Sequence, residues 1–133
     1  MFMLDTNVII YCLRHPEYPI NRIVEKHLGD DICISVITLA ELEYGIHKST
    51  RPDQNRTALQ AMLAGISVIE MNADAALHAG EILATLESRG ERIGDRDTLI
   101  AAHARSMGYT LVTHNTKEFS RVNGLCLEDW QAL

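Results

Sequence analysis

Short apolar segments that alternate with amphipathic helical patterns constrain the fold of this chain more than any other feature of its sequence. Strands are expected at 2–4 (FML), 32–35 (ICIS), 67–70 (SVIE) and 109–113 (YTLVT), with a weaker one at 125–127. Helical patterns separate these segments, and parallel strands need such crossover connections. The sequence therefore predicts an α/β fold with a short parallel sheet of four to five strands and helices on both faces.

Capping residues and apolar spacing define the expected helices. The first carries Val8 to Leu13, and the others run at 20–28, 36–48, from Pro52 to Gly65, from Asn72 to Gly90 and at 95–107, followed by a helical turn at Phe119. Thr6 or Asn7 is expected to cap the first helix, and Asp95 the last long one. Core-facing positions in the last two long helices are expected at Leu77, Ile82, Leu83, Leu86, Leu99, Ile100, Ala104 and Met107.

The composition is that of a single folded domain over residues 1–133, with 47% hydrophobic and 23% charged residues. Asp5 interrupts the first apolar run and no basic region precedes it, so neither a signal peptide nor a membrane span is indicated. We expect a cytoplasmic protein. Its three widely separated cysteines, Cys12, Cys33 and Cys126, are expected to be buried as small hydrophobic residues.

The formal net charge of −6 argues against a protein that coats nucleic acid non-specifically, because phosphate binding is driven by Lys and Arg. It does not exclude a nuclease, because the carboxylates of an active site contribute negative charge while basic residues gather around its rim.

Polar residues follow the expected strands at their carboxyl ends, where open parallel sheets bind ligands. Asp5 follows the first strand, Ser35 ends the second, and Thr113 with Asn115 follows the fourth. Two further acids, Glu41 and Asp97, lie in helices that start near the same edge. The sequence predicts that these groups converge.

Carboxylates packed closely together repel one another, by about 3 kcal/mol per pair at 5 Å and an effective dielectric constant near 20. A hard dication such as Mg²⁺ or Mn²⁺ offsets this repulsion with oxygen ligands. Such a metal supports phosphodiester hydrolysis in which water, not a side chain, attacks the phosphorus. No side-chain nucleophile is then required.

Each of these residues also has a purely structural interpretation. Asp5 could be only a turn or capping residue, Asp97 could act only on the helix dipole, and Asn115 could only shape a turn. Glu43, two residues after Glu41, could be confused with it. The histidines show no metal-binding spacing and are expected to be surface or hydrogen-bonded groups, namely His47, His103 and His114.

Two other functions remain open at this point. A receiver-like or phosphatase-like phosphotransfer domain would use an aspartate at a strand end, but it also needs a Lys at a later strand end, and Lys117 is badly placed for this. A binding module would use the carboxylates only to hold a structural ion.

Four ordered motifs resemble those of PIN-domain ribonucleases, and specifically of the VapC toxins. They are MLDTNVIIY at the N-terminus, TLAELEYG at 38–45, IGDRDTLIAAHA at 93–104 and LVTHNTKEF at 111–119, and the similarity extends to LEDW at 127–130. The resemblance implies an α/β/α sandwich and a Mg²⁺- or Mn²⁺-dependent endoribonuclease, often specific for tRNA, that a VapB-type antitoxin holds inactive. It also implies a homodimer or a toxin–antitoxin hetero-oligomer.

The resemblance assigns the catalytic and metal-binding acids to Asp5, Glu41 and Asp97, with Glu41 acting directly or through water. The supporting residues it implies are Thr6, Asn7, Thr113 and Asn115. Relatives often carry a Pro and an aromatic residue before the last acid, where this chain has GDRD. This departure leaves open whether Asp95 adds a fourth carboxylate, and whether Arg96 meets RNA phosphate or neutralises the acids.

The expected RNA contacts are basic residues near the acidic rim, namely Lys48, Arg51, Arg96, His114 and Lys117. The seven aromatic side chains (one Trp, four Tyr and two Phe) form no recognisable base-stacking motif. Close relatives suggest an initiator tRNA anticodon loop, but the residues themselves do not name the RNA.

Overall fold

A five-stranded parallel sheet forms the centre of the computed structural model, which describes residues 1–132. The strand order is β3-β2-β1-β4-β5. The strands are β1 (Phe2–Leu4), β2 (Ile32–Ser35), β3 (Ser67–Ile69), β4 (Thr110–Val112) and β5 (Cys126–Glu128). This confirms the predicted α/β fold, with strand boundaries that differ from the expected ones by at most one residue.

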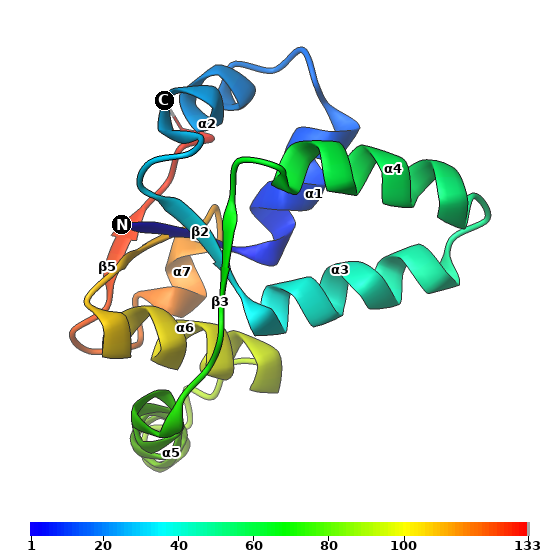
Figure 1. Cartoon of the computed structure of the whole chain (residues 1–133). Helices are drawn as coiled ribbons and strands as arrows, with labels where there is room; N and C mark the ends of the chain where they lie inside the picture. Colours follow the sequence, from blue (N-terminus) through cyan, green and yellow to red (C-terminus); the bar gives the residue numbers. More distant parts are fainter. Residues whose placement is uncertain (133) are drawn as a thin grey trace.

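Helices cover both faces of the sheet, as Figure 1 shows. They are α1 (Thr6–Arg14), α2 (Ile20–His27), α3 (Val36–Lys48), α4 (Pro52–Leu63), α5 (Ala73–Ser88), α6 (Asp95–Met107) and α7 (Thr116–Phe119). The buried side chains of α1 to α4 form one hydrophobic cluster, and those of α5 to α7 form another. The protein is therefore an α/β/α sandwich.

The strands are apolar along their whole length because both faces of the sheet are buried. Neighbouring residues of a strand point to opposite faces. In β1, Met3 belongs to the cluster of α5 to α7, and Leu4 to that of α1 to α4. Leu111 and Val112 divide in the same way in β4. Each short strand thus joins two helical layers.

The first turn of α1 differs from the expectation. Asp5, and not Thr6 or Asn7, is its N-cap, because the Asp5 carboxylate accepts a hydrogen bond from the Thr6 backbone N–H at 2.8 Å. Gly94 occupies the N-cap position of α6 without a side-chain bond, and Asp95 is the first residue of that helix. The capping predicted for Asp95 is therefore wrong.

Three residues expected in the core are exposed. Leu77 is 73% exposed because α5 packs mainly on α6 through Ala75, Ile82 and Leu86, and Leu77 lies about 200° around the helix from Ala75. Met107 is the last residue of α6 and is 37% exposed. Cys126 is exposed because it lies in β5, at the edge of the sheet, whereas Cys12 and Cys33 are buried as predicted.

Membrane crossing is not supported by any helix within residues 1–132, since none combines the necessary length and apolarity.

From the packing of the central sheet, we expect two leucine truncations to differ strongly in their effect on the free energy of unfolding. Leu111→Ala removes a fully buried side chain from β4, and we expect it to lower the free energy of unfolding by about 2–5 kcal/mol. Leu77→Ala, at an exposed position of α5, should change it by less than about 0.5 kcal/mol. Urea unfolding of both variants measures the difference. Equal destabilisation by the two would contradict this packing.

Candidate functional site

Asp5 is a buried carboxylate at the end of the central strand. It is 3% exposed and follows β1, and its backbone N–H extends the sheet by donating to the Val112 carbonyl at 2.9 Å. Its Oδ1 accepts from the Thr6 N–H, and its Oδ2 accepts from the Thr113 hydroxyl at 3.0 Å. Burial raises the pKa of Asp5 above its ordinary value; the bonds from Thr113 and Thr6 oppose this, and the charge of Glu41 adds to it.

Glu41 is oriented towards Asp5 by a threonine. The Thr6 hydroxyl donates to Glu41 Oε1 at 2.7 Å and also lies 3.0 Å from the Thr38 hydroxyl. Both Thr38 and Glu41 belong to α3, which begins directly after β2. Thr6 therefore connects the first acid to the second, through its backbone to Asp5 and through its side chain to Glu41.

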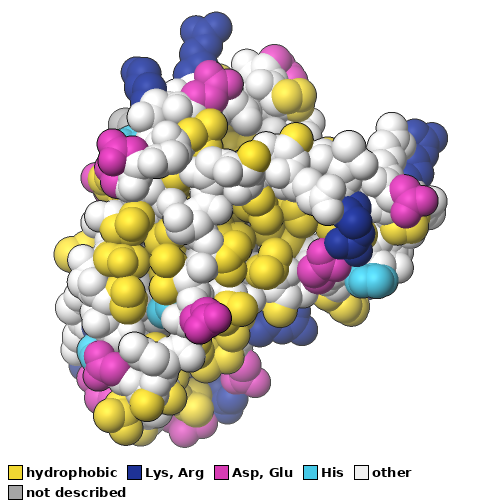
Figure 2. Space-filling model, in the orientation of Figure 1, with side chains coloured by type: hydrophobic (Ala, Val, Ile, Leu, Met, Phe, Trp, Pro, Cys, Tyr) yellow, Lys and Arg dark blue, Asp and Glu magenta, His cyan; other side chains and the backbone are white. Residues whose placement is uncertain are grey.

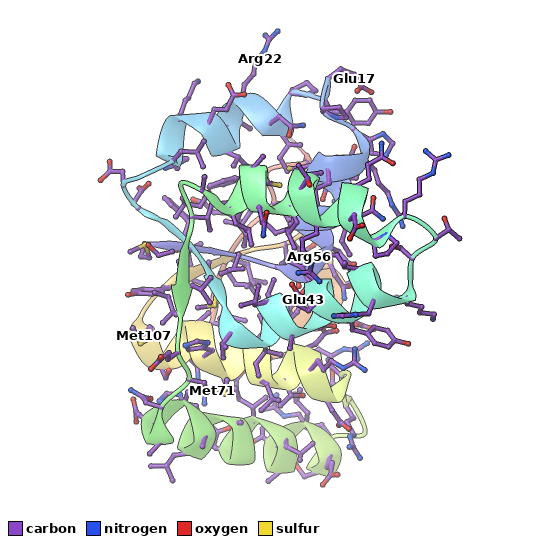
Figure 3. The ribbon with its side chains drawn as sticks, turned by 45° about the vertical axis from the view of Figure 1, so that its right-hand side comes forward. Glu17, Arg22, Glu43, Arg56, Met71 and Met107 are labelled. Atoms are coloured by element: carbon purple, nitrogen blue, oxygen red, sulfur yellow. The ribbon has the colours of Figure 1, made fainter. Side chains whose placement is uncertain are left out.

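Glu43 has a different environment, which resolves the ambiguity between the two glutamates of α3. Its carboxylate forms a bidentate pair with Arg56 of α4, with distances of 2.5 and 2.9 Å. Figure 3 shows the two side chains meeting between α3 and α4. The hydrogen bonds from Arg56 lower the pKa of Glu43. Glu43 thus joins two helices and does not face Asp5.

Asp97 lies in the first turn of α6 and is partly buried. Its pKa is raised from 3.8 to about 6, with burial as the largest cause. The remaining causes of this shift are neighbouring charges, in decreasing order those of Asp5, Glu41 and Glu118. Acids that lie far apart in the sequence therefore act on one another at the carboxyl edge of the sheet.

Glu118, in α7, is an acid of this group that the sequence analysis missed. Its Oε2 accepts from the Asn115 side-chain amide at 2.8 Å, and the Asn115 backbone N–H donates to the Thr113 hydroxyl at 3.0 Å. The Thr113 hydroxyl in turn donates a hydrogen bond to the Asp5 carboxylate. The spacing of three residues between Asn115 and Glu118 in a helical turn was the available signal.

Asp95 and Arg96 point to different partners. The Asp95 carboxylate pairs with Arg92 at 2.9 Å and is 80% exposed. Asp95 is also absent from the charges that raise the pKa of Asp97. Arg96 Nη1 lies 3.5 Å from Glu41 Oε2, so its guanidinium offsets part of the acidic charge.

The site is an open hollow and not a closed cage. Within residues 1–132, no three His, Cys, Asp or Glu side chains converge closely enough to form a ready-made metal cage. A hollow of about 620 Å³ is lined by Asp5, Asn7, Tyr11, His114, Asn115 and Gln131. Glu41 lines two neighbouring grooves. The donors are oxygens, which suit a Mg²⁺ ion that keeps several waters and binds few carboxylates.

The residues that line this hollow include no lysine, and Lys117 is exposed on α7. A phosphotransfer domain needs a lysine beside its aspartate, so the geometry disfavours that alternative.

His103 is a buried, hydrogen-bonded histidine, as predicted. Its Nε2 lies 3.1 Å from the Glu70 carbonyl, and its Nδ1 lies 2.8 Å from the Ser35 hydroxyl. A carbonyl only accepts, so Nε2 carries the proton and Nδ1 accepts from Ser35. Burial lowers the pKa of His103. The ring ties α6, which carries Asp97, to the start of α3, which carries Glu41.

Of the basic residues expected to contact RNA, only His114 lines the hollow, and its Nδ1 lies 3.0 Å from Asp129. Lys48 and Arg51 lie at the turn between α3 and α4. Lys48 Nζ lies 5.4 Å from the Tyr44 ring centroid. Figure 2 shows hydrophobic side chains across the middle of the face viewed, with most of the Lys and Arg side chains towards its periphery.

Known proteins with these features were found by sequence and by structure. Residues 2–125 match the PIN domain family. The chain is 42% identical over 129 residues to the tRNA(fMet)-specific endonuclease VapC of Shigella flexneri, covering 97% of each chain. It is 40% identical over 131 residues to the ribonuclease VapC2 of Rickettsia felis, covering 98% of each.

Two solved structures have nearly the same fold. The DNA-bound VapBC of Salmonella typhimurium superposes with a TM-score of 0.92 at 38% identity, covering 97% of each chain. VapBC2 of Rickettsia felis, bound to a DNA fragment from its promoter, gives a TM-score of 0.89 at 40% identity, covering 97% of this chain and 98% of the other. Sequence, fold and acidic edge agree, and the chain therefore belongs to the VapC family of PIN-domain proteins.

Proposed function

We propose that this chain is a Mg²⁺- or Mn²⁺-dependent endoribonuclease, the toxin of a toxin–antitoxin pair. The observation that carries this proposal is that Asp5, Glu41 and Asp97, from separate elements, lie near enough at one edge of the sheet for their charges to act on one another. Burial, and after it the charges of Asp5 and Glu41, raises the pKa of Asp97 to about 6. Like charges gathered at this edge are unfavourable without a cation. The names of the similar proteins, ribonuclease and tRNA(fMet)-specific endonuclease, support the same activity.

Asp5 and Asp97 would hold the ion, with Glu41 acting directly or through water. Glu118 joins this set because its charge acts on Asp97. When bound, the ion supplies Lewis-acid stabilisation of the phosphate and a water of lowered pKa. Asp95 is left out of this set because it pairs with Arg92.

Hydrogen bonds within the protein orient Asp5 and Glu41 before any ion binds. Thr113 and the Thr6 N–H hold the two oxygens of Asp5, and the Thr6 hydroxyl holds Glu41. Each carboxylate oxygen has a second lone pair, which these bonds leave free for a ligand. The adjoining hollow, with Asn7 and His114 in its lining, has the size of a small-molecule site of about 300–1,000 Å³ and would receive the nucleotide.

The substrate we propose is tRNA, with the initiator tRNA anticodon loop as the first candidate, because two of the most similar relatives are tRNA(fMet)-specific endonucleases. Such a substrate places the protein in the cytoplasm. Among the expected RNA-contacting residues, His114 is the best supported, because it lines the hollow beside Asp5.

A VapB-type antitoxin is the proposed protein partner, because the similar solved structures are VapBC complexes. A groove of about 310 Å³ between α1, α3 and α4 suits a segment of such a partner. Its lining is largely apolar, with Ile10, Leu13, Leu42, Ile46 and Leu59, and includes both Arg14 and Glu41. An antitoxin segment with apolar residues would fit the groove and cover Glu41.

Asp97→Asn should lower Mg²⁺- or Mn²⁺-dependent cleavage of tRNA by at least about 100-fold while the fold stays intact, because the change removes a ligand and a repelling charge. Asp95→Asn is the matched control two residues away and should keep activity. Cleavage products are followed with and without EDTA. Full activity of the Asp97→Asn variant, or cleavage that EDTA does not stop, would exclude this mechanism.

The raised pKa of Asp97 predicts how the stability of the metal-free protein depends on pH. The folded pKa, about 6, exceeds the ordinary value of 3.8, so the neutral acid favours the folded state. This contribution is complete below about pH 3.8 and is lost as the pH rises to about 6. Urea midpoints in EDTA should therefore show a smaller decline over this window in Asp97→Asn than in the unchanged protein. An identical decline would contradict the assignment.

A further inference from the structure

Three aromatic rings gather where α1 meets the connection to α2. Tyr11 lies in α1, His15 is its C-cap, and Tyr18 follows in the connection. The His15 and Tyr18 rings are stacked, with centroids 4.4 Å apart and an interplanar angle of 9°. The Tyr11 centroid lies 5.0 Å from that of His15 and 5.6 Å from that of Tyr18. Glu17, labelled in Figure 3, marks this corner of the molecule.

The backbone of this corner is fixed by hydrogen bonds. The Asn21 side-chain amide donates to the His15 carbonyl at 2.8 Å and to the Tyr18 carbonyl at 3.2 Å. The Tyr18 N–H also donates to the His15 carbonyl, at 3.0 Å. The backbone that carries the His15 and Tyr18 rings is therefore fixed before a ligand arrives, which reduces the ordering cost of binding.

Packing in the hydrophobic core does not explain the position of these three rings. Tyr18 is 39% exposed, and neither it nor His15 belongs to a core cluster, whereas Tyr11 packs partly against one. Within residues 1–132, no hydrogen bond engages the His15 ring or the hydroxyls of Tyr11 and Tyr18. Their polar edges are thus available to a ligand.

The ring cluster begins at the acidic site itself. Tyr11 lines the same hollow of about 620 Å³ as Asp5 and Asn115. From this wall the rings of His15 and Tyr18 continue outward to the surface. A polynucleotide with its phosphate at Asp5 would have these rings beside a neighbouring nucleotide.

Electrostatics at the site favour a non-ionic contribution to RNA binding. The acids repel phosphate, and the lining of the hollow includes His114 but no Lys or Arg. Arg96 is engaged with Glu41. Unpaired bases stack on Tyr and His rings, and each stacked base contributes to binding irrespective of its sequence.

We propose that Tyr11, His15 and Tyr18 form a stacking platform for an unpaired base of the RNA, next to the nucleotide whose phosphate is cleaved. This inference rests on the proposed ribonuclease function and adds the side chains that hold an unpaired base of the looped RNA beside the cleaved nucleotide.

The test measures binding of fluorescently labelled RNA stem-loops in the Asp97→Asn background, in which the RNA stays intact. Tyr18→Ala should weaken binding at least about fivefold, and Tyr18→Phe, which keeps the ring, should not. Leu77→Ala is the matched control, since it truncates an exposed apolar side chain on α5. The slope of binding against salt concentration should stay the same in Tyr18→Ala, because no ionic contact is lost.

Stem-loops with one abasic position in the loop identify the stacked base. At that position, removal of the base should weaken binding by the parent protein but have no effect on Tyr18→Ala. If the unchanged chain cleaves RNA while Tyr18→Ala binds every stem-loop as tightly as its parent, the platform is overturned and the ribonuclease stands. The platform would also be overturned if Tyr18→Ala weakened binding of the antitoxin but left RNA binding unchanged. If the unchanged chain neither binds nor cleaves RNA, both proposals fail.

Discussion

The repulsion between buried carboxylates at one edge of the sheet is the constraint on which the arrangement of this protein depends. Burial and neighbouring acids raise the pKa of Asp97 to about 6, and burial raises that of Asp5. Hydrogen bonds from the hydroxyls of Thr6 and Thr113 and from the Thr6 backbone N–H partly offset this cost at Asp5 and Glu41. Carboxylates that are kept close together by hydrogen bonds, despite their mutual repulsion, are typical of a functional site that binds a cation.

The parallel sheet brings these acids together. Its strands all end at the same edge, so the residue after β1, the first turns of α6 and α7 and the second turn of α3 meet there. His103 joins α6 to the beginning of α3 through Ser35, which links the position of Asp97 to that of Glu41. The packing of both helical layers on the sheet is therefore what sets the distances between the acids.

Strand and helix periodicity predicted the fold and the positions of Asp5, Glu41 and Asp97, because both depend on local pattern and on the common edge of a parallel sheet. Glu118 was missed, because the sequence does not distinguish a glutamate on the surface from one that faces the site until the position of α7 is known. Leu77 was wrongly assigned to the core, because the sequence does not show which face of α5 packs on α6. The sequence did not predict the ring cluster either, because Tyr18 contacts His15 only through the turn of the chain that follows the end of α1.

The central claim is that Asp5 and Asp97 share one divalent ion, and manganese anomalous scattering from crystals of the protein with Mn²⁺ tests it most directly. We predict an anomalous peak within coordination distance of both carboxylates, and its loss in crystals of Asp97→Asn. A protein with no peak at this edge, or with manganese bound only at other surfaces, would contradict the account.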